Sequence, residues 1–180
     1  KNPYNRYKIT KKNINNLKNI IKIGKFLKDD VIIKIDFNNG IVCNKKKIEL
    51  RTISLFNKID TFGHITHSDW FLTLNNIGII KFLKELYDVW NYRLNLSNEL
   101  KRQIVPPHGK AFYNIGFNNL NAYENLKLKE LALNVIDKLI NKSSDSNKQS
   151  LGAFYVLGSL TLVSKNAADS LPALYQSFSY

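Results

Sequence analysis

The chain has 180 residues, which is enough for one domain with a hydrophobic core. Hydrophobic residues make up 44% and aromatic residues 12% of it, a composition that excludes a wholly disordered chain. We therefore expect a single domain over residues 1–180.

The formal net charge of +13 is unevenly distributed. Residues 1–60 hold 15 Lys and Arg against 5 Asp and Glu, whereas residues 61–180 hold 12 against 9. An abundance of Lys, Asn, Ile, Tyr and Phe with few Arg is also what an AT-rich genome produces, but codon bias would not concentrate charge in one third of the chain. The asymmetry favours a polyanionic partner for the first third, and a merely solvated basic surface is the alternative.

Residues 1–45 predict a basic N-terminal helix followed by a short β-hairpin. After Thr10, a candidate N-cap, Ile14, Leu17 and Ile21 recur at helical spacing with Lys on the other faces. The β-branched run "VIIKIDF", the turn "NNG" and the run "IVC" then predict a hairpin near residues 31–43.

Residues 46–105 predict the middle helices. The first begins near Lys46, and Gly63 is placed to stop it; its apolar face is formed by Ile48, Leu55, Phe56, Ile59 and Phe62. A longer helix follows, with Asn75 or Asn76 as its cap and an apolar face formed by Ile77, Ile80, Leu83, Tyr87 and Trp90. Ser97 opens a further helical turn, which Pro106 and Pro107 end.

Residues 106–126 are rich in Gly and Asn and predict a loop, which is the best internal boundary. Residues 127–180 predict the C-terminal helices. The apolar stretch "LGAFYVLGSLTLV" (151–163) should be the central buried helix, because Gly152 and Gly158 let a neighbouring helix approach closely. Ser164 caps a last helix in which Pro172 should cause a kink. The fold class is thus mainly α, a helical bundle or a short helical array.

Common catalytic chemistries find little support in the sequence. "HITH" (64–67) with Asp69 has neither the Cys pairs nor the helical His pair with a Glu that are typical of zinc sites, so turn residues are the favoured interpretation. No phosphate-binding loop or nucleophile elbow occurs, and no cofactor is expected. Glu85 and Asp88 match helix-surface ion pairs better than an acid–base couple. Trp90 is expected to be a core residue rather than a base-stacking platform.

Compartment and membrane association can be inferred only coarsely. Cys43 is the single cysteine, so no internal disulfide can form, which fits a reducing, intracellular compartment. The apolar stretch 151–163 falls short of the roughly 20 residues that span a bilayer.

Three patches carry a resemblance: "DWFLTL" (69–74), "ELYDVWNYRLNLSNELKRQIVPP" (85–107), and "LGAFYVLGSLTLVS" (151–164) with "SLPALYQSF" (170–178). In these patches the chain resembles uncharacterised proteins of large AT-rich DNA viruses. The resemblance covers residues 51–180 and implies a viral source, with the host cytoplasm, the nucleus or the virion as location. It implies no activity and no catalytic residue.

These features favour a non-enzymatic protein that associates electrostatically and non-specifically with nucleic acid or a nucleoprotein assembly. The candidate phosphate contacts are Arg6, Lys11, Lys12, Lys18, Lys22, Lys25, Lys28, Lys45, Lys46 and Lys47. A possible contact loop is formed by Pro106, Pro107, His108 and Lys110. The alternatives are a helical protein-interaction scaffold within a larger assembly, and an enzyme in which His64, His67 or His108 meets a carboxylate.

Overall fold

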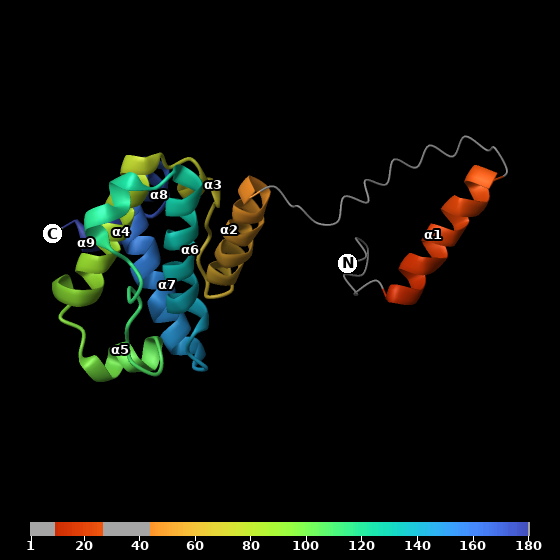
Figure 1. Ribbon diagram of the computed structural model, residues 1–180. Helices are drawn as coiled ribbons and strands as arrows, with labels where there is room; N and C mark the ends of the chain where they lie inside the picture. Colours follow the sequence, from red (N-terminus) through yellow and green to blue (C-terminus); the bar gives the residue numbers. More distant parts are fainter. Residues whose placement is uncertain (1–9, 27–43, 180) are drawn as a thin grey trace. The chain divides into compact units, whose positions relative to one another are not determined.

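The computed structural model describes residues 10–26 and 44–179, and the chain divides into two units, residues 1–41 and 42–180 (Figure 1). In the first unit the described element is the helix α1 (Lys11–Phe26). The hairpin predicted near residues 31–43 lies outside the described residues. The single domain expected over residues 1–180 stays a prediction.

The described part of the second unit is built from helices joined by turns, so the expected mainly helical fold class is confirmed. These helices are α2 (Asn44–Asp60), α3 (Asp69–Leu72), α4 (Asn76–Asp88), the π-helix η1 (Val89–Arg93), α5 (Asn98–Ile104), the 3₁₀-helix η2 (Phe117–Ala122), α6 (Asn125–Asn141), α7 (Ser146–Thr161), α8 (Lys165–Ser170) and α9 (Pro172–Phe178). Over the described residues, none of the helices has the length and apolarity that crossing a membrane requires.

The centre of the second unit is α7, as the sequence predicted. It packs against α4, α5, α6, α8, α9 and η1, and its residues from Tyr155 to Thr161 are all buried (Figure 1). Two glycines make this packing close: a Cβ atom at Gly152 would overlap the carbonyl of Leu139 in α6, and one at Gly158 would overlap the ring of Phe178. The absence of a side chain at both positions therefore sets how near α6 and α9 lie to α7.

The helix starts follow the predicted caps. The side-chain oxygen of Asn75 accepts a hydrogen bond from the amide of Gly78 at the start of α4, and that of Ser97 accepts one from Leu100 at the start of α5. Ser164 accepts one from Ala167 at the start of α8. Gly63, with φ +91°, lies in the turn that follows the end of α2.

One predicted face was partly wrong. Ile77 is 77% exposed, because it shares a face of α4 with the exposed Lys81 and Lys84. The buried face instead carries Ile79, Phe82, Leu83 and Leu86, and it continues into η1 with Val89 and Trp90.

Two predicted segments also differ from the structure. Pro172 does not kink a continuous helix, because α8 ends at Ser170 and Pro172 opens α9 at a position where its missing amide costs no hydrogen bond. The predicted loop 106–126 contains η2, and Ala111, Phe112 and Leu120 within it are buried. This segment is therefore part of the core of the second unit.

Candidate nucleic-acid interface

The first group of candidate residues lies on α1. The Thr10 hydroxyl accepts a hydrogen bond from the amide of Asn13 and so caps the helix. Lys11, Lys18 and Lys22 are seven and four residues apart and therefore share one face of the helix. They and Lys12 are exposed, and residues 11–26 include no Asp or Glu. The result is a cationic stripe without a carboxylate on the same helix.

The remaining candidates of the first third are placed only in part. Lys25 belongs to α1. Arg6 and Lys28 lie outside the described residues.

The second group, Lys45, Lys46 and Lys47, forms the first turn of α2 and is exposed. The helix macrodipole disfavours positive charge at this end, and the turn holds no acidic residue to offset it. The position of the three lysines is therefore unfavourable with respect to the helix macrodipole. Lys46 is paired, because its Nζ lies 3.0 Å and 3.1 Å from the two carboxylate oxygens of Glu49.

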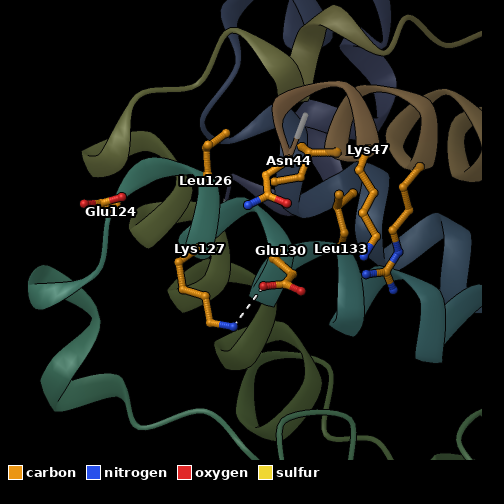
Figure 2. A pocket seen from close by; sticks show the side chains of 9 residues that line it. Asn44, Lys47, Glu124, Leu126, Lys127, Glu130 and Leu133 are labelled. Carbon is orange, nitrogen blue, oxygen red and sulfur yellow. Dashed lines mark hydrogen bonds and ion pairs between the residues drawn. The ribbon is translucent and has the colours of Figure 1, made fainter. Parts of the chain in front are cut away.

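Lys47 also lines a hollow of about 360 Å³ between α2 and α6 (Figure 2). The lining is mixed in charge: Arg51 and Lys127 lie on it together with Glu124 and Glu130. The Nζ of Lys127 lies 2.9 Å from a carboxylate oxygen of Glu130, and this hydrogen bond and charge lower the pKa of Glu130 (Figure 2). Because cations and carboxylates both line the hollow, it does not favour an anion.

Arg51, which lines the same hollow, already binds side chains of α6. Its guanidinium donates to the side-chain oxygen of Asn134 at 2.6 Å and to a carboxylate oxygen of Asp137 at 3.3 Å. Lys47 makes no ion pair within the described parts of the chain, but its positive charge, like those of Lys127 and Arg51, lowers the pKa of Glu130 in the same hollow.

A further cation, not identified from the sequence, lies behind the Lys45–Lys47 turn. Lys129 of α6 is buried, and its Nζ donates a hydrogen bond to the carbonyl oxygen of Leu72. Burial, and then the positive charge of Lys45, lower the pKa of Lys129. Its place on the inner side of α6 gives it a structural role rather than a role in phosphate contact.

The candidate contact loop lines a second hollow, of about 430 Å³. Pro106, Pro107, His108 and Lys110 all lie on it, and the structure adds Val105, Tyr113 and Lys138 of α6. Tyr113 and Lys138 were not identified from the sequence, because nothing in a Gly- and Asn-rich segment indicates which side chains face the same hollow. The structure thus brings the four candidates of this loop together.

Comparison with known proteins assigns no identity. No family model, curated protein or solved structure matches the chain. The resemblance to proteins of AT-rich DNA viruses therefore stays an expectation, and function has to be argued from the residues themselves.

Within residues 10–26 and 44–179, none of the ion pairs joins a histidine to a carboxylate. Over the described residues, no group of three His, Cys, Asp or Glu side chains could hold a metal ion. The ring of His67 meets that of Trp70 edge to face at 5.7 Å. Glu85 and Asp88 are bound by Arg93 at 2.9 Å and 2.8 Å, so the predicted ion pairs are confirmed.

The stretch around Trp90 is scaffold. Trp90 is 2% exposed, and its indole Nε1–H donates to the carbonyl oxygen of Gly109 at 3.2 Å. The predicted core position of Trp90 is thus confirmed, and this tryptophan is no surface for a base.

Proposed function

We propose that the protein associates with nucleic acid through non-specific electrostatic contacts, with the lysines of α1 and of the Lys45–Lys47 turn next to phosphates. One observation carries this proposal: α1 places Lys11, Lys18 and Lys22 on one exposed face and contains no carboxylate. A face that carries several exposed lysines attracts a polyanion, which releases its counterions on binding.

The first turn of α2 supports the same partner. Lys45 and Lys47 make no ion pair within residues 10–26 and 44–179. The pair between Lys46 and Glu49 is solvent-exposed, and such pairs contribute about 0.2–1 kcal/mol, so a phosphate can replace the carboxylate. The scarcity of Arg argues against base-specific readout, because bidentate contacts to guanine are made mainly by Arg.

The test is a titration with duplex DNA and with single-stranded RNA at about 50 mM and about 200 mM salt. A variant with Lys11, Lys12, Lys18 and Lys22 replaced by Gln should bind more weakly. For duplex DNA, its salt dependence (the slope of log K against log salt) should be shallower by about 0.9 for each phosphate that the variant no longer neutralises. The matched control replaces four exposed lysines of the second unit by Gln, namely Lys81, Lys84, Lys142 and Lys165.

Both variants lower the formal charge from +13 to +9, so they separate position from total charge. If the α1 variant loses affinity and the control keeps it, the proposal is supported. Absence of binding by the unaltered protein at low salt would reject it, and so would equal losses in the two variants.

A second candidate function is a helical protein-interaction scaffold within a larger assembly. It is favoured by a hollow of about 440 Å³ at the C-terminal helices, lined mainly by apolar groups that include Phe154, Leu171, Pro172 and Leu174. Ala173 lies on its wall and is exposed, so Ala173→Lys adds bulk and charge there without disturbing the core. This function predicts self-association, measured by sedimentation, that Ala173→Lys abolishes and the α1 variant leaves intact.

A further inference from the structure

The loop between α5 and η2 is anchored to the core by buried side chains and by hydrogen bonds. Val105, Ala111 and Phe112 are buried. Between them, the amide of Gly109 donates to the carbonyl of Val105 at 2.8 Å, and the indole of Trp90 donates to the carbonyl of Gly109 at 3.2 Å. The surface that this loop presents is therefore preorganised, which lowers the entropic cost of binding a ligand.

The outer side of the loop displays an aromatic ring. Phe112 packs against Tyr87 and Phe117, with ring centroids 5.3 Å and 6.1 Å away. Its neighbour Tyr113 is 75% exposed. The Nζ of Lys110 lies over the Tyr113 ring, 5.9 Å from its centroid, at the outer limit of a cation–π contact.

The hollow beside this ring is cationic. Its charged side chains are Lys110 and Lys138, His108 lies beside them, and its lining, which lies wholly in the described second unit, contains no carboxylate. Lys138 comes from α6 and donates one hydrogen bond to the carbonyl of Ala111 at 3.1 Å, which leaves two N–H donors of its ammonium group. The hollow between α2 and α6, in contrast, holds both Glu124 and Glu130.

An aromatic ring beside lysine side chains, in a hollow whose lining contains no carboxylate, matches one class of ligand. We propose that this hollow binds a nucleobase that carries a phosphate, with the base stacked on Tyr113 and the phosphate next to Lys110, Lys138 and His108. Its volume of about 430 Å³ falls within the range of small-molecule sites. Stacking on an aromatic side chain tolerates every base, so no base preference is expected.

The same chemistry has two sources, a free mononucleotide or one nucleotide of a single strand. Duplex DNA is excluded from this site, because its bases are stacked inside the helix and cannot reach a side chain in a hollow. This inference does not rest on the proposed function, since none of its residues belongs to α1 or to the Lys45–Lys47 turn.

The test uses the full chain and isothermal titration with adenosine 5′-monophosphate, adenosine and inorganic phosphate. The monophosphate should bind more tightly than either fragment. Tyr113→Ala should weaken its binding about tenfold or more, as expected for loss of one stacked base, and Tyr113→Phe should retain it. Lys110→Gln should weaken the monophosphate but leave adenosine unchanged.

Tyr175→Ala is the matched control, because Tyr175 is 42% exposed on α9 and does not line this hollow. It should leave binding unchanged. A short single-stranded RNA is then titrated into the chain with the four α1 lysines replaced by Gln. Binding that depends on Tyr113 there identifies a single strand as the source, whereas binding of the monophosphate alone identifies a free nucleotide.

Two results would overturn the inference. The first is that neither adenosine 5′-monophosphate at millimolar concentration nor the single-stranded RNA binds. The second is that Tyr113→Ala and Tyr175→Ala weaken binding equally. Neither depends on α1. Monophosphate binding that persists when the α1 variant and the unaltered protein bind DNA equally well would reject the proposed function and leave this site standing.

Discussion

Among the described residues, Lys129 is the one charged residue that is buried. Burying an ammonium group is unfavourable unless its donors are satisfied, and here the hydrogen bond to the carbonyl of Leu72 ties α6 to the end of α3. The charge of Lys45 adds to this cost. Burial and the neighbouring positive charge therefore both disfavour the charged form of Lys129.

The lowered pKa of Lys129 makes stability depend on pH. The unfolded chain holds this proton more tightly than the folded chain. The charged form of Lys129 therefore lowers the free energy of unfolding, and this loss is complete below the pKa of the folded chain. It disappears as the pH rises to the ordinary lysine value of 10.5. The free energy of unfolding of the unaltered protein, minus that of Lys129→Met, should therefore rise between neutral pH and pH 10.5.

Urea unfolding at several pH values measures this difference. Lys84→Met, at an exposed position of α4, is the control and should show no such rise. A difference for Lys129→Met that is flat with pH would contradict the prediction.

Between elements, α6 and α7 make the most extensive helix–helix contact of the second unit. Gly152 lies against the backbone carbonyl of Leu139, and a backbone cannot move aside as a flexible side chain can. Small residues at this position thus fix the distance between the two longest buried surfaces of the fold.

Gly152→Ala should destabilise the protein by about 1–3 kcal/mol, the usual cost of overpacking, with the upper end expected because the clash is with backbone. The intrinsic helix preference of Ala returns only about 1 kcal/mol. Gly116→Ala is the matched control, because a Cβ there meets nothing within 4 Å and φ is −84°, which suits any residue. Thermal unfolding of the two variants tests the pair, and equal stabilities would contradict the expectation.

Features that depend on local chemistry could be predicted from the sequence. The caps Asn75, Ser97 and Ser164 act within one turn, and the small residues of 151–163 indicate close packing whatever the neighbour is. Features that depend on which neighbour arrives could not be predicted. Ile77 fits an apolar pattern but is 77% exposed, on a face of α4 that it shares with the exposed Lys81 and Lys84.

The candidate sites divide in the same way. That Lys11, Lys18 and Lys22 share a face follows from helical periodicity alone. Tyr113 of the loop and Lys138 of α6 line the same hollow, and no spacing in the sequence indicates this. That residues far apart in the sequence line the second hollow could therefore not be predicted from the sequence.

At the scale of the whole molecule, the buried core of the described residues lies in the second unit, whereas the short first unit carries more than half of the formal net charge. Every buried hydrophobic side chain of the described residues lies between Ile48 and Phe178. Residues 1–41 instead hold ten Lys and Arg against three Asp, so removing them lowers the formal charge from +13 to +6.

Deleting residues 1–41 should therefore leave the stability of the remainder within about 0.5 kcal/mol, the usual range for changes away from a core. Nucleic-acid binding at low salt should fall sharply, because the α1 lysines go with the deleted segment. Chemical denaturation and a DNA titration of the shortened chain measure the two effects. A shortened chain that unfolds at much lower denaturant would contradict the separation.

The two tryptophans, Trp70 and Trp90, are 3% and 2% exposed and both belong to the second unit. Exposure to water on unfolding will shift their emission to longer wavelengths, so intrinsic fluorescence reports the opening of this unit. Because residues 1–41 contain no tryptophan, melting of α1 gives no signal of this kind. Fluorescence and far-ultraviolet circular dichroism, recorded together, can therefore assign each transition to its own unit without a label.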